Sequence, residues 1–338
     1  MPESFSRMNA RVKAAAATCL HRSGALAVLR RFQPRDRGLV LMFHRILPRE
    51  QKRLCYDPHL VMAEEVFGPL LELLAREHNV VSLGALVAGG AGKQAVAITF
   101  DDAWEDTYSV AYPLLRQFGM PATVFLCPDL MSAAGQGAML PEERFARIWD
   151  HAAEDERREF QADVTKALGE AAPLGRKSLS DALKRVPMDA RLALLGEWER
   201  EFATPAPQRR ALMTWDEAKI MAADGITLGS HTMRHCTLTS ESDAVITREL
   251  ARSREEIFSR TGDRPNFLAY PNGAFNARVE EIARTAGYSH AFTTIPGFLD
   301  KTTRVWTVPR LPMEDGVVVG AGDRFNESRA RTYLQLLR

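Results

Sequence analysis

The stretch AITFDDAWEDTY, residues 97–108, places two adjacent carboxylates, Asp101 and Asp102, directly after an apolar run that ends at Phe100. A short, nearly continuous apolar run is typical of a strand that is buried on both faces of a parallel sheet. Adjacent Asp residues after such a strand more often cap a helix or form a turn than build a site. Whether Asp101 and Asp102 belong to a functional site depends on which residues the other strands place beside them.

Six further apolar runs, together with 96–100, divide the chain into about seven strand and helix units. These runs cover 39–43, 123–126, 226–229, 267–270, 290–294 and 305–308. Helical patterns lie near 63–78, 110–118, 216–223, 244–261 and 277–286. Alternating strands and helices predict a parallel sheet covered by helices. About seven such units predict an α/β barrel or barrel-like sheet, with its chemistry at the carboxyl ends of the strands.

One region interrupts this alternation. From about 129 to 210 the chain has no convincing strand and is charged with a helical period. We interpret it as a helical insertion, which either caps the active face or is solvated. The predicted organisation is a basic N-terminal segment over 1–38, a main domain over 39–320 that carries the insertion, and a C-terminal tail over 321–338.

The N-terminal segment has a charge pattern of its own. Residues 1–38 hold eight Lys and Arg residues against only Glu3 and Asp36, interspersed with apolar residues. This predicts one or two amphipathic helices with a break near Ser23 and Gly24. Such a segment either lies on an anionic membrane surface or packs on the main domain with solvated arginines, and the sequence favours neither.

Composition limits the classes of function. The 338-residue chain is 46% hydrophobic and has a net charge of +1, which gives no reason to expect a polyanionic partner such as nucleic acid. The four cysteines form no CxxC pair, so neither a redox motif nor a thiolate zinc site is indicated. No apolar run approaches the ~20 residues of a membrane span, and no convincing signal peptide precedes the domain. We expect a cytoplasmic protein, with peripheral contact at the inner membrane through residues 1–38 if these bind lipid.

Polar groups follow several of the predicted strands at the point where each strand ends. They are His44 after Phe43, Asp101 and Asp102 after Phe100, Ser230 and His231 with nearby His235 after Gly229, and Pro271-Asn272-Gly273 after Tyr270. Each group alone is more often structural than functional. If the strands are parallel, however, all of them gather at one rim, and together they indicate a site.

The combination supplies what a hydrolytic metal site needs. One carboxylate and two imidazoles, from Asp102, His231 and His235, bind a divalent ion and leave positions open for water and a substrate oxygen. Asp101 is then free to take a proton from the metal-bound water. Zinc suits these ligands well, although cobalt, nickel, manganese or iron could also occupy them.

The motifs TFDD, SHTMRH and YPNG together resemble those of the polysaccharide deacetylases, the carbohydrate esterase family 4 proteins that share the NodB homology domain. The resemblance extends from about Leu39 to Met313, excluding the insertion. It implies a distorted (β/α)7 barrel that hydrolyses N-acetyl, or less often O-acetyl, groups from sugars. It also implies that Asp101 is the catalytic base, and that Asp102, His231 and His235 bind the metal.

Two motifs of that family are altered. Many members have an Arg-x-Pro-Tyr-Gly motif whose arginine touches the base, but here Ala269 stands at the arginine position. We hypothesise that Arg310 takes its place. The C-terminal Leu-x-x-His motif, which carries the general acid, is also missing, since no histidine follows His290. The sequence LMFHRILP resembles the opening of a branch whose acid has moved to the N-terminal strand, which makes His44 the candidate acid.

The resemblance also suggests how substrate binds. A backbone N–H near Tyr270, within the Tyr270-Pro271-Asn272 turn, is expected to help bind the acetyl oxygen. Trp104 and Tyr108 could stack on a sugar ring, or could instead be core residues on a helix face. The expected substrate is an acetylated glycan, or a lipid-linked or nucleotide-linked sugar intermediate.

Two other classes of function stay open at this point. One is a relative that binds sugar without turnover, which the missing arginine motif favours and the intact acid and histidine set disfavours. The other is a metal amidohydrolase that acts on a C–N bond outside a sugar.

Overall fold

The structure is a computed structural model that describes residues 37–52, 55–89, 92, 94–202 and 209–336. The amphipathic helices predicted within residues 1–38 fall almost entirely outside these residues.

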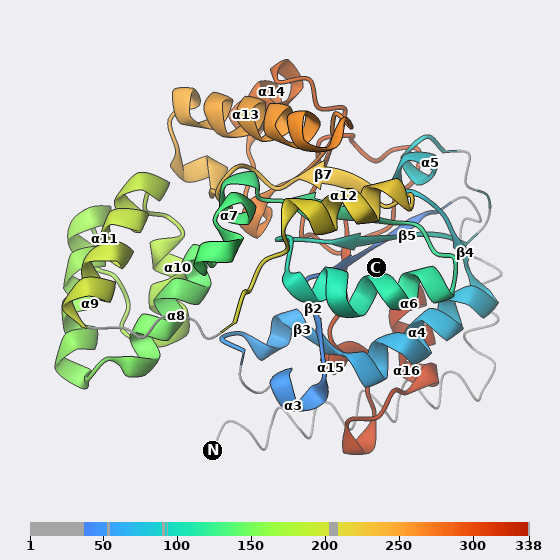
Figure 1. Ribbon diagram of the computed structural model, residues 1–338, viewed down its shortest axis with the longest axis horizontal. Helices are drawn as coiled ribbons and strands as arrows, with labels where there is room; N and C mark the ends of the chain where they lie inside the picture. The colour runs from blue at the N-terminus through green and yellow to red at the C-terminus, as the bar shows by residue number, and fades with distance from the viewer. Residues whose placement is uncertain (1–36, 53–54, 90–91, 93, 203–208, 337–338) are drawn as a thin grey trace.

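A curled parallel sheet forms the centre of the molecule (Figure 1). Its strands lie in the order β10 (Leu311–Pro312), β1 (Leu39–Phe43), β5 (Ala95–Phe100), β6 (Ala122–Leu126), β7 (Thr227–Ser230), β8 (Phe267–Ala269) and β9 (His290–Phe292), and β4 (Asn79–Val80) also pairs with β5. These described strands all pair in parallel. The predicted distorted barrel with helices around it is confirmed.

The last strand lies in a different place from the one predicted. Residues 305–308 form no strand but run beside β9, where Phe292 bridges to Val308. Val305 is 43% exposed and only Val308 is buried, so the run as a whole is less buried than the other strands. Pro309 follows this run and cannot extend it as a hydrogen-bonded strand, because proline has no N–H for a sheet hydrogen bond. Strand β10 begins only at Leu311 and pairs with β1, so the first and last strands are neighbours, as expected.

Helices cover the outside of the sheet at the places that the sequence predicts. They are α4 (Glu64–Glu77), α6 (Tyr112–Gln117), which continues a π-helical turn over Thr107–Ala111, α12 (Trp215–Ala223), α13 (Asp243–Thr261) and α14 (Ala277–Thr285). The remaining elements are shorter, except for α16: β2 (Arg45–Leu47), α3 (Arg49–Lys52), β3 (Val61–Ala63), α5 (Leu83–Val87), α7 (Pro128–Ser132), α15 (Asp315–Val318) and α16 (Glu327–Leu336). In Figure 1, α12 and α13 lie above the sheet and α4 and α16 below it.

Alternation along the strands separates two apolar cores. Phe43 and Phe100 face outward and contact Phe67 of α4, with ring centroids 5.3 to 6.1 Å apart. Residues of the opposite parity, such as Val40 and Phe125, fill the interior of the barrel. Side chains of a strand point alternately to its two faces, so the residues that follow Phe43 and Phe100 return to the interior side. This outer aromatic cluster therefore fixes the strand ends that carry His44 and Asp101.

Four helices form a separate helical module at the left of Figure 1, defined here as residues 141–201. It consists of α8 (Pro141–His151), α9 (Glu154–Leu168), α10 (Arg176–Leu183) and α11 (Met188–Glu201). The module has its own apolar cluster, in which the rings of Phe160 and Trp198 lie 4.6 Å apart between centroids. Its stability therefore depends largely on contacts within these helices.

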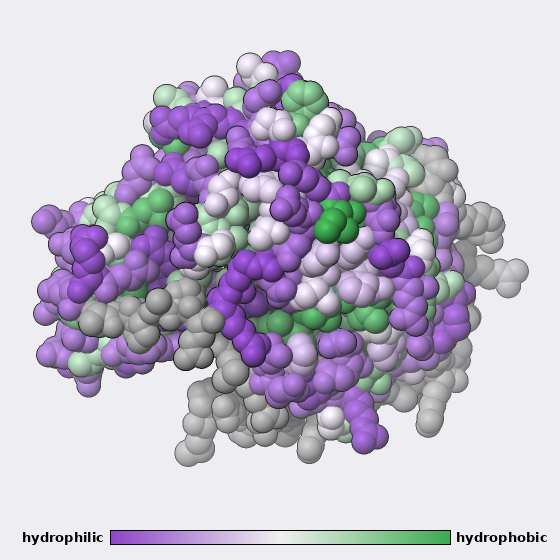
Figure 2. Space-filling view, viewed as in Figure 1, coloured by the Kyte–Doolittle hydropathy of each residue, from purple (hydrophilic) through white to green (hydrophobic). Residues whose placement is uncertain are grey.

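The described helices include no candidate for a membrane span. Within the described part of the chain, each helix is too short or too polar to cross a bilayer. On the face shown in Figure 2, the coloured apolar residues are scattered among polar ones.

The module core can be tested with one substitution. Phe160→Ala should lower the free energy of unfolding by about 3–5 kcal/mol, because a fully buried ring leaves a cavity. Equilibrium urea unfolding, followed by tryptophan fluorescence, measures the change. Leu174→Ala is the control, since Leu174 is 51% exposed and should cost little. Equal costs for the two variants would contradict the assignment of a packed core around Phe160.

Candidate active site

The two carboxylates lie on an unusual turn at the carboxyl end of β5. Asp102 and Ala103 both have left-handed backbone conformations, with φ of 75° and 58°. Such values cost about 1–3 kcal/mol each in residues other than glycine and persist only where neighbouring structure holds them. Here Met213 donates its N–H to the Ala103 carbonyl at 2.9 Å, and the Trp104 indole donates to Asp102 Oδ2 at 3.0 Å. The chain is thus held so that both acids face the site.

Asp102, His231 and His235 converge on one point. The Nε2 atoms of His231 and His235 lie 3.3 and 3.4 Å from Asp102 Oδ1. All three residues are buried, and one ligand atom from each lies within 4.8 Å of the others. Asp102 Oδ1 has no hydrogen-bond partner although it is buried. An orphaned carboxylate oxygen between two imidazole nitrogens fits a divalent cation, because nothing else here satisfies it.

The second nitrogen of each imidazole also has a neighbour. His231 Nδ1 lies 2.8 Å from the carbonyl oxygen of Ala269, at the end of β8. His235 Nδ1 lies 3.3 Å from Oε2 of Glu142, which belongs to α8 of the helical module. Burial alone would raise the pKa of Glu142, but the charge of His235 lowers it to about 2. Glu142 is therefore a carboxylate in this environment.

Asp101 is held by Arg310. The guanidinium donates from both terminal nitrogens to the two carboxylate oxygens, each at 2.7 Å. Arg310 is fully buried, and it also donates to the Thr293 carbonyl and to Thr99 Oγ1. Burial would raise the pKa of Asp101, but the charge of Arg310 and its hydrogen bonds outweigh this and lower it. Arg310 thus occupies the place beside Asp101 that the hypothesis assigns to it.

His44 follows β1 and shares the electrostatic environment of the two acids. Burial lowers its pKa, the charges of Asp102 and Asp101 oppose that change, and Arg310 and His231 add to it. As a whole residue His44 is half-buried, whereas Asp101 and Asp102 are almost fully buried. His44 is therefore more exposed than either acid.

The expected substrate residues differ in what they can do. Trp104 is fully buried and its indole N–H is bonded to Asp102. Its side chain therefore cannot stack on a sugar ring, and the alternative of a core residue is the one observed.

The turn over Tyr270-Pro271-Asn272 is expected from the sequence to offer a backbone N–H to the acetyl oxygen. Tyr270 is also fully buried, and its N–H donates to the Phe292 carbonyl, so that N–H is not available for an acetyl oxygen. In the same turn, Pro271 is buried, whereas Asn272 is exposed and has a left-handed backbone with φ of 58°. Asn272 is thus the residue of this turn that can meet a substrate.

Sequence reasoning missed Glu142, since nothing in the helical pattern of the insertion distinguishes it from its neighbour Glu143. Only the contact with His235 does so.

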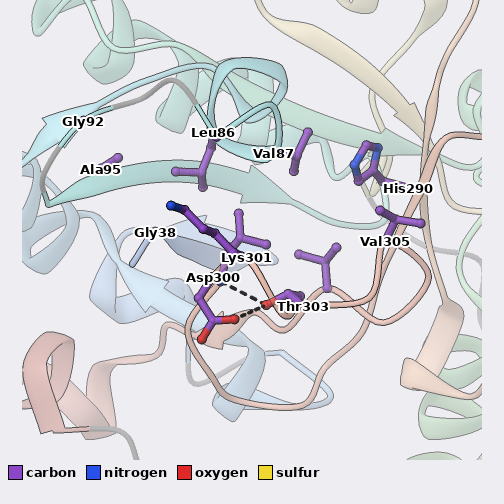
Figure 3. Close-up of a pocket in the computed structure, with 13 residues that line it drawn as sticks. Gly38, Leu86, Val87, Gly92, Ala95, His290, Asp300, Lys301, Thr303 and Val305 are labelled. Carbon is purple, nitrogen blue, oxygen red and sulfur yellow. Dashed lines mark hydrogen bonds between the residues drawn. The ribbon is translucent and has the colours of Figure 1, made fainter. Parts of the chain in front are cut away.

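A separate cavity of about 600 Å³ lies at the amino ends of the strands, opposite the carboxyl ends that carry the candidate active site (Figure 3). Gly38, Ala95 and His290 line it, and these residues precede or begin β1, β5 and β9. The carboxylates and the ligand histidines are not among its lining residues. It is therefore distinct from the candidate active site.

The Arg310 contact can be tested by a double-mutant cycle. Arg310→Met should lower the free energy of unfolding by about 3–5 kcal/mol, because it leaves Asp101 buried without a counter-charge. Asp101→Asn/Arg310→Met should cost less than the sum of the two single changes, since neither charge is then stranded. Urea unfolding at neutral pH measures all four proteins. Additive costs would contradict a direct, buried ion pair.

Known proteins resemble this chain in sequence and in fold. Residues 88–159 and 173–291, more than half of the chain, match the sequence model named polysaccharide deacetylase. A curated relative, "Putative polysaccharide deacetylase YxkH" of Bacillus subtilis (strain 168), is 21% identical over 236 residues. That alignment covers 70% of this chain and only 57% of the relative.

Solved structures resemble the fold over most of the chain. The Streptococcus pyogenes deacetylase PplD in complex with acetate has a TM-score of 0.55 at 18% identity and covers 82% of this chain and 92% of its own. The BpsB deacetylase domain from Bordetella bronchiseptica has a TM-score of 0.56 at 18% identity and covers 83% and 98%. Because the family model matches more than half of the sequence, this chain belongs to the polysaccharide deacetylase family.

Proposed function

We propose that this protein is a metal-dependent deacetylase that removes N-acetyl groups from an amino-sugar-containing glycan or glycolipid. The observation that carries the proposal is the convergence of Asp102 Oδ1 with the Nε2 atoms of His231 and His235, beside an Asp101 that is paired with Arg310. The three converging residues would hold the cation, and their donor set suits zinc. Bound there, a divalent cation supplies a water of lowered pKa and polarises the acetyl carbonyl.

Asp101 is the proposed general base. Its lowered pKa keeps it ionised at neutral pH, so it can accept the proton of the attacking water. The Arg310 fork fixes both carboxylate oxygens, which orients the acid without any rearrangement during the reaction. The role of Arg310 is thus to position and stabilise Asp101.

His44 is the proposed general acid. The reaction forms a bond between the water oxygen and the acetyl carbon, breaks the bond from that carbon to nitrogen, and releases acetate and a free amine. The departing nitrogen needs a proton, which His44 would donate. Burial lowers the pKa of His44, and the negative charges of Asp102 and Asp101 only partly oppose this, so the protonated imidazole is a ready proton donor to the departing nitrogen.

Three observations support the proposed glycan substrate. Membership of the family and the similarity to a deacetylase solved with acetate support an acetylated sugar. The basic, partly apolar sequence of residues 1–38 supports a substrate carried on an anionic membrane surface, such as a lipid-linked sugar on the inner leaflet. The exposed Asn272 donates to Thr237, two residues after His235, which supports a binding surface near that proposed ligand.

The direct test is acetate release from a short N-acetylglucosamine oligomer. Metal-stripped protein should be inactive, and zinc should restore release. Asp101→Asn should keep the metal but lower turnover about 100- to 10,000-fold, because Asp101 is the proposed proton acceptor and is not one of the three proposed metal ligands. Asp216→Asn, at an exposed position on α12, is the control and should match the wild type. Loss of metal from Asp101→Asn would refute the division of roles between the two acids.

His44 can be tested separately through the leaving group. His44→Ala should retain metal and should slow amide hydrolysis by about 100-fold or more, since the nitrogen then leaves without its acid. Hydrolysis of an activated acetate ester, whose leaving group needs no proton, should change much less. His290→Ala is the matched control, because His290 lies at the other ends of the strands. A wild-type rate for His44→Ala on the amide would move the acid role elsewhere.

A further inference from the structure

The contact between the helical module and the metal-ligand histidines is built from buried atoms. His235 Nδ1 and Glu142 Oε2 lie 3.3 Å apart, and neither atom makes a hydrogen bond to any other described group. Both residues are only 7% exposed. A buried carboxylate oxygen and a buried ring nitrogen at this distance leave each other as the available partner.

Glu142 is itself anchored from the other side. Arg191 of α11 is 2% exposed, and its Nη1 lies 3.4 Å from Glu142 Oε1. The same guanidinium donates to the carbonyls of Lys184 and Val186 and to Thr237 Oγ1. The carboxylate is thus fixed within the module, with Oε1 toward Arg191 and Oε2 toward His235.

A histidine that binds a metal through Nε2 carries its proton on Nδ1, and that N–H needs an acceptor that fixes the tautomer and the ring orientation. For His231 the acceptor is the Ala269 carbonyl, at 2.8 Å. The corresponding neighbour of His235 is the carboxylate of Glu142. The two ligand imidazoles therefore have equivalent support, one from the barrel and the other from the module.

We propose that Glu142 is a positioning residue for the metal ligand His235, and that the helical module is for this reason part of the metal centre. The proposal rests on the metal site of the proposed function. Glu142 accepts the Nδ1–H of His235, which turns Nε2 toward Asp102 and makes the imidazole a stronger ligand. The module thereby completes the site from outside the sheet.

Zinc affinity of the full-length protein, measured by competition with a chromophoric chelator, tests the proposal. Glu142→Met removes the acceptor and should weaken zinc binding about 10- to 100-fold. Glu142→Gln keeps an acceptor oxygen of the same shape and should weaken it less than Glu142→Met. Glu199→Gln is the matched control, because Glu199 pairs with Arg144 inside the module and should leave zinc affinity unchanged.

A second readout separates positioning from general stability. In the zinc-loaded protein, the proton NMR signal of His235 Nδ1–H should shift in Glu142→Gln and should broaden through exchange with water in Glu142→Met. The Nδ1–H signal of His231 should stay in place and serves as the internal reference. If Glu142→Met does not fold, the smaller loss of affinity and the shifted signal of Glu142→Gln still decide the question.

Each outcome has one meaning. Wild-type zinc affinity and an unchanged His235 signal in both Glu142 variants would overturn the positioning role, while zinc-dependent acetate release would leave the proposed function intact. Absence of zinc binding in the wild type would overturn both. Weakened binding in the Glu142 variants without acetate release from any acetylated sugar would support the positioning role and refute the proposed substrate.

Discussion

The buried pairing of Asp101 with Arg310 is the constraint on which the rest of the site depends. Two adjacent carboxylates end a strand that is fully buried, and ionised acids cannot stay there without compensation. Arg310 compensates Asp101 with two short hydrogen bonds, whereas Asp102 is left with an oxygen directed at two imidazoles. The adjacent acids thus have unlike surroundings, which suits one to proton transfer and the other to binding a cation.

Much of the fold could be predicted because strand burial and helix period are local signals. Six of the seven predicted strands overlap observed ones, and the five predicted helices are present. The error at 305–308 has a specific cause, since an apolar run before Pro309 resembles a strand whether or not it is buried. The true last strand, with only Leu311 and Pro312, is too short to give a pattern.

The site was predictable to the extent that strand ends reveal it. Residues that directly follow strands, such as His44 and Asp101, meet at one rim because the strands are parallel. Burial is not encoded so locally, so the sequence left open whether Trp104 contacts a sugar or lies in the core, and it did not reveal that the N–H of the buried Tyr270 is already bonded to Phe292. Glu142 could not be predicted at all, because its contact with His235 depends on how the helical module docks on the barrel.

The position of Arg310 in the chain has a consequence for how the protein is made. Asp101 and Arg310 are 209 residues apart, and the short strand that follows Arg310 joins the sheet only by pairing with β1. During synthesis, the acidic turn emerges long before its counter-ion, and domains generally fold as units once their chain is complete. Contacts of such long range also form slowly, because loop closure must precede them. The ion pair that neutralises Asp101 can therefore form only after residue 310 has been synthesised and β10 has reached β1, which places assembly of the candidate active site late in folding.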